Sequence, residues 1–366
     1  MSDTAIGTDR RMWVVAVPRD TVLVRDGRSF DAGTDVVAET VRPWPSTVAG
    51  AIRQAYGREP AEVRGPVLGL AVRRAGDGAA GETWRSYFPM PADIVVADGA
   101  ARWAFRLRPQ PTAISTDLAI DGLQWLTGAG LAGKSRPLGG WLPGSRLGAY
   151  LRGELLGPAG GMAVGELQRV EAEPLTPERR VGLARTPGRT ASAGLLYQAT
   201  HLRLRDGWGF LAECKLPEGW DDRGAPTGPV PLGGRGRLTD IRPTPGVRWP
   251  DPPTSHPGGR VLVYVATPAL WPGGWRIPEP PGARLVAAAM AGDPEPVATA
   301  SPRLGLWATR ALRWAVPAGS VYLLEFGDQA EADRWAAAVH GTAYGRAADD
   351  RLRTAGFGVV LTGVWS

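Results

Sequence analysis

Arginine is the residue type through which this sequence could do most of its chemistry. All but two of its 42 basic residues are arginines, and the formal net charge is +6. A guanidinium group binds phosphate through paired hydrogen bonds and stacks on aromatic rings, so an arginine-rich surface suits nucleic acid. Codon usage in a GC-rich genome explains the same composition, because it raises Arg, Gly, Pro and Ala together. The positions of the arginines therefore have to decide between the two interpretations.

Three segments place arginines where they could bind a phosphate backbone. In 18–47, a basic hairpin precedes a helix start, and a helix N-terminus attracts anions. Segment 178–203 combines dense arginines with a tyrosine that could stack on a base. In 232–238, glycines would let backbone amides approach a phosphate. The candidate RNA-binding residues are Arg19, Arg25, Arg28, Ser46, Thr47, Arg180, Arg185, Arg189, Tyr197, Gly233, Gly234, Arg235, Gly236 and Arg237.

Each of these segments also has a purely structural interpretation. The first could be a surface hairpin with Asp–Arg pairs and a routine helix cap, and the second an edge strand protected by charge. The third could be an ordinary solvated hairpin loop. For the Gly-rich loop the two interpretations are about equally supported, so a variant that lacks both Arg235 and Arg237 is the natural test of a role in RNA binding.

A phosphate-loop pattern suggests a different chemistry. Gly128 to Ser135 fits G-x-x-x-x-G-K-[ST], in which Lys134 would contact the phosphates of a nucleotide. The mechanism requires a helix that begins next to this lysine and directs its positive end at the phosphates. Prolines and glycines between Pro137 and Pro143 cannot continue such a helix. We therefore interpret the match as chance in a Gly-rich chain.

One histidine is a candidate for catalysis. His201 lies in an alternating strand with Tyr197 and Arg203 nearby, and such a group could cleave RNA without a metal ion. A histidine in this setting is more often one residue of a polar strand face. The single cysteine excludes intramolecular disulfides and Cys-based zinc sites, and only three histidines are scattered along the chain. We expect no catalytic residue, no metal and no cofactor.

The elements that must position these residues are short. With 50 glycines and 34 prolines in 366 residues, the chain cannot be mainly helical, because both residues break helix interiors. An apolar fraction of 43% with 15 tryptophans still provides a core. The N-terminus, Met1 to Trp13, has no apolar core of signal-peptide length, and no uninterrupted apolar run has the length of a membrane span. We expect a soluble, cytoplasmic protein without a membrane partner.

Local signals place several elements. Strands are expected at 12–17, 21–25, 260–267, 320–326 and 357–365, and a hairpin over 83–107. A helix is expected with Ser46 as N-cap and Gly57 at its end, and a second with Asp328 as N-cap, Glu331 completing a capping box and Gly341 at its end. Strand, helix and strand at both ends of the chain indicate two α+β units with mostly antiparallel sheets.

Read in order, several short motifs resemble the Cmr-type RAMP subunits of type III-B CRISPR effector complexes, in the group that caps the 5′ end of the guide RNA. Regions 100–146 and 217–260 depart from that pattern, and the shared order of the other motifs spans nearly the whole chain. The motifs are Pro18 to Asp20, Arg25 to Phe30, Pro45 to Ala51, Trp141 to Gly153, Glu178 to Gly182, Gly194 to Tyr197, Gly233 to Arg237, Val316 to Tyr322 and Gly356 to Gly358.

The resemblance implies an α+β fold of two ferredoxin-like (RRM-like) domains with long loops and an inserted hairpin, which we expect within 83–146. We place the domains at 11–190 and 191–366. It also implies a non-catalytic subunit that holds the 5′ handle of the guide RNA (crRNA), docks on the large cyclase/polymerase-like subunit and contacts a backbone RAMP subunit. The alternatives are a metal-independent RAMP endoribonuclease that uses His201, a nucleotide-binding protein that uses the 128–135 loop, and a protein-only assembly module.

Overall fold

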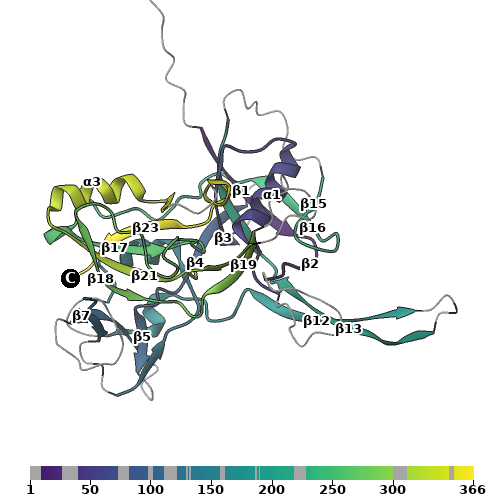
Figure 1. Cartoon of the computed structure of the whole chain (residues 1–366), viewed down its shortest axis with the longest axis horizontal. Helices are drawn as coiled ribbons and strands as arrows, with labels where there is room; N and C mark the ends of the chain where they lie inside the picture. Colours follow the sequence, from purple (N-terminus) through teal and green to yellow (C-terminus); the bar gives the residue numbers. More distant parts are fainter. Residues whose placement is uncertain are drawn as a thin grey trace, which may run out of the picture.

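Two antiparallel sheets form the body of the protein in the computed structural model (Figure 1). All pairings between named strands of the described residues are antiparallel. Few helices accompany the strands, so the expected α+β class with mostly antiparallel sheets is confirmed. The structure describes residues 10–26, 40–72, 82–97, 102–110, 122–128, 131, 133–156, 161–185, 188, 190–217, 228–299, 311–345 and 350–366.

The first sheet has seven strands, and its central strands come from distant parts of the chain. β1 lies between β14 and β16, which follow it by about two hundred residues of sequence. Helix α1 covers one face and buries Val48, Ala51 and Ile52 against it. The order is β10 (Trp141–Pro143), β4 (Thr83–Pro89), β3 (Glu62–Val72), β14 (Trp208–Lys215), β1 (Arg11–Pro18), β16 (Leu238–Pro243), β15 (Val230–Pro231), with α1 at Pro45–Tyr56.

The start of α1 differs from the prediction. Trp44 is the N-cap and Pro45 occupies the first helical turn, so the expectation that Ser46 caps the helix is wrong. Proline fits this position because its fixed φ suits a helix and its missing N–H would have had no helical partner. At the other end, Gly57 has φ 62°, the left-handed conformation that the sequence predicts for it.

The second sheet has five strands and carries α3. Asp328 accepts a hydrogen bond from the backbone N–H of Ala330 at 2.6 Å, so the expected N-cap is confirmed. Gly341 follows with φ 67°. The strand order is β18 (Ala283–Ala289), β21 (Val321–Phe326), β17 (Arg260–Val265), β23 (Val359–Val364), β22 (Thr342–Ala343), with α3 at Gln329–Val339, α4 at Asp350–Thr354 and a short 3-10 helix at Pro257–Gly259.

The two sheets share one hydrophobic core. Val15 and Leu211 of the first sheet belong to the same buried cluster as Leu262 and Leu361 of the second. Phe88 makes an edge-on ring contact with Tyr264 across the boundary, with centroids 6.5 Å apart. The two sheets are therefore packed against each other through a continuous core.

A long hairpin extends from the body (Figure 1). It consists of β12 (Leu175–Arg185) and β13 (Ala191–Leu204), and β2 (Thr21–Val22) pairs with its base. The inserted hairpin was expected within 83–146, whereas this one lies at 175–204. The domain boundary predicted at 190/191 falls at its tip, and β14 and β16 beyond it still belong to the sheet of β1.

Smaller sheets complete the structure. β5 pairs with β6 as a hairpin, as the sequence predicts for 83–107, and β9 joins its other edge. The remaining elements are β5 (Ile94–Ala97), β6 (Trp103–Arg106), β9 (Ser135–Pro137), β11 (Met162–Ala163), β7 (Arg108–Gln110), β8 (Trp125–Thr127), β19 (Glu295–Thr299), β20 (Ala311–Ala315), α2 (Gly144–Leu151) and a 3-10 helix at Val164–Leu167.

A buried polar network joins this small sheet to α2 and to the last strand. Asp93 accepts hydrogen bonds from Arg106 Nε at 3.0 Å and from the Tyr150 hydroxyl at 2.7 Å. The side chains of Asp93 and Arg106 are only 1% and 5% exposed. Arg106 also lies over the Tyr150 ring and donates to the Val364 carbonyl at 3.2 Å. Burial, reinforced by the charge of Asp93, raises the pKa of Tyr150, so its hydroxyl remains a donor.

Candidate nucleic-acid interface

Three arginines from distant parts of the sequence converge on one carboxylate. Asp20, in the turn between β1 and β2, accepts hydrogen bonds from Arg180 at 3.1 Å, Arg203 at 2.9 Å and Arg237 at 2.7 Å. Arg180 lies on β12, Arg203 on β13 and Arg237 beside the Gly-rich loop. Asp20 therefore ties the base of the long hairpin to that loop. We call Asp20, Glu178, Arg180, Arg203 and Arg237 the arginine cluster.

Glu178 is the second acid of the arginine cluster. It accepts from Arg180 Nε at 2.8 Å and from Arg203 Nε at 2.5 Å. Hydrogen bonds from Arg203 and Arg180 lower the pKa of Glu178. Partial burial alone would raise the pKa of Asp20, but the hydrogen bonds from Arg180 and Arg203 outweigh it and lower this pKa as well. Both acids are thus ionised at neutral pH, and three arginines against two acids leave one net positive charge. All five side chains are partly exposed, and the hydrogen bonds to Asp20 and Glu178 hold the guanidinium groups in a fixed arrangement.

The Gly-rich loop lies against the segment 23–25 of the chain. The Gly234 N–H donates to the Leu23 carbonyl at 2.7 Å. Gly233 has φ 82°, and a Cβ on it would be 2.5 Å from the same carbonyl oxygen, so only glycine allows this approach. Arg25 and Arg235 border the hollow between the two segments. At least two of the predicted glycines therefore seat the loop on its neighbour.

The structure brings some of the predicted residues together and leaves others apart. Arg180 and Arg237 are in the arginine cluster, while Arg19 pairs with Asp240 at 2.9 Å. Ser46 is exposed and Thr47 half-buried on α1. Arg28 and Arg189 lie outside the described residues, and of Arg185 and Tyr197 only the backbone, in β12 and β13, is described. The purely structural interpretation of 18–47 predicts Asp–Arg pairs, and such pairs are present between Arg19 and Asp240 and between Asp20 and Arg180. Several of the predicted arginines nevertheless lie close together.

The catalytic candidates have structural explanations. His201 is 1% exposed, and its Nδ1 lies 2.9 Å from the Thr21 hydroxyl. Burial, together with the positive charges of Arg180 and Arg237, lowers its pKa, so the ring is neutral inside the hairpin base. Ser135–Pro137 is strand β9, so the helix that a phosphate loop needs does not follow Lys134. Within the described ranges, no group of three or more His, Cys, Asp or Glu could hold a metal ion.

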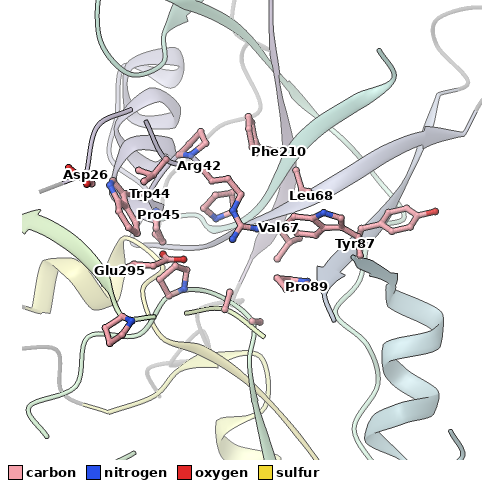
Figure 2. Close-up of a pocket in the computed structure, with 18 of the residues that line it drawn as sticks. Asp26, Arg42, Trp44, Pro45, Val67, Leu68, Tyr87, Pro89, Phe210 and Glu295 are labelled. Atoms are coloured by element: carbon pink, nitrogen blue, oxygen red, sulfur yellow. The ribbon is translucent and has the colours of Figure 1, made fainter. Parts of the chain in front are cut away.

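A cavity of about 430 Å³ lies between the first sheet and the loops next to the second sheet, below the start of α1 (Figure 2). Hydrogen bonds to two carbonyls of the segment 23–25 place the cavity close to the Gly-rich loop. The Val41 N–H donates to the Val24 carbonyl at 2.8 Å, and the Trp44 indole donates to the Arg25 carbonyl at 3.4 Å. Arg25 borders the hollow beside the Gly-rich loop, and the next residue, Asp26, lines the cavity. The aromatic side chains that line the cavity are Trp44, Tyr87, Trp141 and Phe210.

Two charged side chains from distant parts of the chain line this cavity. Arg42 precedes α1, and its guanidinium lies 4.9 Å from the centroid of the Trp141 ring. Glu295 begins β19 and is half-buried. Burial raises the pKa of Glu295, while the charge of Arg42 acts in the opposite direction. Figure 2 shows Arg42 above and Glu295 below the space that they share.

Local sequence patterns do not identify Asp20 and Glu178 as the acids that hold the arginine cluster together. They also do not identify Arg42 and Glu295 as charged residues that line the same cavity. Alternation gives a signal for part of the cluster, because Glu178 and Arg180 are two residues apart on one strand and so share a face. Nothing local links Arg42 to Glu295, which are brought to one cavity only by the packing of distant parts of the chain.

The sequence matches a family of CRISPR-associated proteins, and the match extends over residues 14–365. The chain therefore belongs to the Cas_Cmr3 family. Two chains of solved structures are similar to this one, each over 86% of both chains. The first, from the cryo-EM structure of the Type III-B Cmr-beta bound to cognate target RNA, has 12% sequence identity and a TM-score of 0.40. The second, from the cryo-EM structure of the Type III-B Cmr-beta bound to cognate target RNA and AMPPnP in state 1, has 14% identity and a TM-score of 0.45. A comparison with curated proteins found no match. No helix in the described parts of the chain is long and apolar enough to cross a membrane.

Proposed function

We propose that this protein is a non-catalytic, RNA-binding subunit of a type III-B CRISPR effector complex, where it holds the 5′ handle of the guide RNA. The observation that carries the proposal is the convergence of Arg180, Arg203 and Arg237, from three elements, on one solvent-facing site. Guanidinium groups in a fixed arrangement suit a phosphate backbone, since they lose less freedom on binding. Membership of the Cas_Cmr3 family supports the setting.

The same proposal includes the partners and the fold. The subunit docks on the large cyclase/polymerase-like subunit and contacts a backbone RAMP subunit. Each half of the protein derives from a ferredoxin-like domain. For the second sheet, the order β18-β21-β17-β23, with α3 in the connection between β21 and β23, supports this assignment, although a loop at 266–282 takes the place of the first helix.

The burial of His201 favours this function over RNA cleavage. A general base must reach the proton that it removes, and the ring of His201 is enclosed and bonded to Thr21. Incubation of the protein with a repeat-containing transcript without metal tests the alternative. Cleavage that His201→Ala abolishes would replace our proposal.

The central test is the affinity for a guide RNA with a repeat-derived 5′ end, measured by fluorescence anisotropy at several salt concentrations. Each phosphate contact to single-stranded RNA contributes about −0.7 to the slope of log K against log salt. Replacing Arg235 and Arg237 together with alanine should weaken binding and make that slope shallower by about 1.4.

A matched control keeps the total charge change constant. Arg276→Ala with Arg284→Ala also removes two arginines, but these pair with Glu279 and Glu325 and are not part of the arginine cluster. We expect this control to bind as the wild type does. A scrambled 5′ handle should bind more weakly than the repeat-derived one. Equal affinity and equal salt slope of the Arg235/Arg237 double variant and the wild type would refute the assignment of the arginines.

A further inference from the structure

The cavity between the sheets has the chemistry of a pocket for a flat, polar ring. Its walls include four aromatic side chains, and its volume of about 430 Å³ is in the range of small-molecule sites. Aromatic walls favour a ring that can stack on them, such as a nucleobase turned out of an RNA strand. Tyr87, Trp141 and Phe210 are buried or packed side chains of the first sheet and Trp44 is buried at the start of α1, so these walls are held in place by packing and the pocket is preformed.

The two charged groups restrict which base fits. Arg42 offers N–H donors and Glu295 offers carboxylate acceptors to the same space, as Figure 2 shows. Guanine presents acceptors, O6 and N7, on one edge and donors, N1–H and the 2-amino group, on the adjacent edge. Adenine has an amino donor next to N7 and an unprotonated N1. Adenine would therefore place its amino donor against the guanidinium donors and its N1 acceptor against the carboxylate acceptors, and neither contact is a hydrogen bond.

From this arrangement we infer that the cavity lined by Trp44, Arg42 and Glu295 binds a single guanine base of the RNA. Arg42 donates to O6 and N7, and Glu295 accepts from N1–H and the 2-amino group. The inference rests on the proposed function and deepens it, since it names a base that the protein reads.

The position of the cavity relative to the arginine cluster fits a strand that uses both. The segment from Leu23 to Asp26 runs from the Gly-rich loop to the cavity, so a nucleotide there would have its phosphate on the arginine side. The cavity is itself unsuited to phosphate, because Asp26, Asp293 and Glu295 line it against one arginine. A base can enter it only if the backbone remains outside.

The test uses the full chain and a set of short oligouridine RNAs that carry one guanosine at each position in turn. Anisotropy should show a gain in affinity of roughly tenfold at one position, the value expected for one bidentate contact to a base. Inosine, which lacks the 2-amino group, should give a smaller gain at that position, and adenosine none.

Two variants connect the preference to the named side chains. Glu295→Gln keeps the shape of the side chain and should abolish the preference for guanosine while binding to plain oligouridine stays within about twofold. Arg42→Ala should also abolish it. Glu59→Gln and Arg53→Ala, exposed residues after and within α1, are the matched controls and should retain it. Thermal unfolding checks that each variant is folded, and Glu295→Asp, which shortens the reach, should give an intermediate preference.

Different failures lead to different conclusions. If the wild type binds RNA without preferring guanosine at any position, or if Glu295→Gln retains the preference, the guanine pocket is wrong and the proposed function stands. If the wild type binds neither these RNAs nor guide RNA, the proposed function fails, and the pocket assignment fails with it.

Discussion

In the buried network of Asp93, Arg106 and Tyr150, replacing Asp93 with asparagine removes the negative charge that neutralises Arg106. The side chain keeps its volume, but Arg106, 5% exposed and hydrogen-bonded to Asp93 at 3.0 Å, loses its counterion. Removal of one partner from a buried pair typically costs about 3–5 kcal/mol, because the remaining charge cannot be hydrated. The Val364 carbonyl and the Tyr150 ring still face Arg106 and offset only part of this loss.

Urea unfolding, followed by tryptophan fluorescence, measures the effect. We expect Asp93→Asn to lose about 3–5 kcal/mol of unfolding free energy. The double variant Asp93→Leu with Arg106→Met should recover most of the loss, because apolar side chains of similar volume can replace a buried pair at little cost. Arg152→Met removes one member of the exposed pair with Glu154, directly after α2, and should leave stability close to that of the wild type.

Two results would contradict this reasoning. A loss of less than about 1 kcal/mol in Asp93→Asn would mean that Arg106 is hydrated or has moved to another acceptor. A double variant as unstable as the single one would mean that Asp93 acts through its shape and its hydrogen bond to Tyr150, and not through the charge of Arg106.

Two further expectations concern pH and the Gly-rich loop. The backbone N–H of Thr362 donates to His340 Nδ1 at 3.0 Å, and burial lowers the pKa of His340. Below about pH 6.5 the unfolded state takes up a proton that the folded state does not, so the free energy of unfolding should fall as the pH drops. Thermal melts at pH 7 and 5 measure this, and His340→Gln should flatten the profile; an unchanged profile would exclude the ring as its source. Gly236→Ala should cost about 1–2 kcal/mol for its left-handed backbone alone. Gly233→Ala should cost more because of the clash with Leu23, and equal melting temperatures would contradict this difference.

Sequence patterns predict this protein well where the cause is local. Asp328 caps α3 because its carboxylate needs only the next few N–H groups, and Gly57 ends α1 because of its own φ. Ser46 was assigned to the cap because its side chain suits that role, whereas Pro45 one residue earlier fixes the start of the helix.

The candidate sites depend on contacts that local patterns cannot encode. Asp20 meets Arg180, Arg203 and Arg237 at separations of 160, 183 and 217 residues. Each of these arginines looks like an ordinary surface charge in its own segment. Motif reasoning therefore selected several of the segments that meet at Asp20 and left out the acid that joins them. Arg42 and Glu295 line the same cavity only because the segment before α1 and the start of β19 pack close together, which no spacing in the sequence specifies.

The interleaving of the first sheet has a consequence for synthesis on the ribosome. β1 emerges among the first residues, but its neighbours β14 and β16 end only at Lys215 and Pro243. At about 5–20 residues per second, the apolar strand waits on the order of ten seconds or longer before it can pair. During that time its unpaired edge is a surface for aggregation or for a chaperone. A nascent chain stalled before residue 208 lacks both neighbours of its first strand.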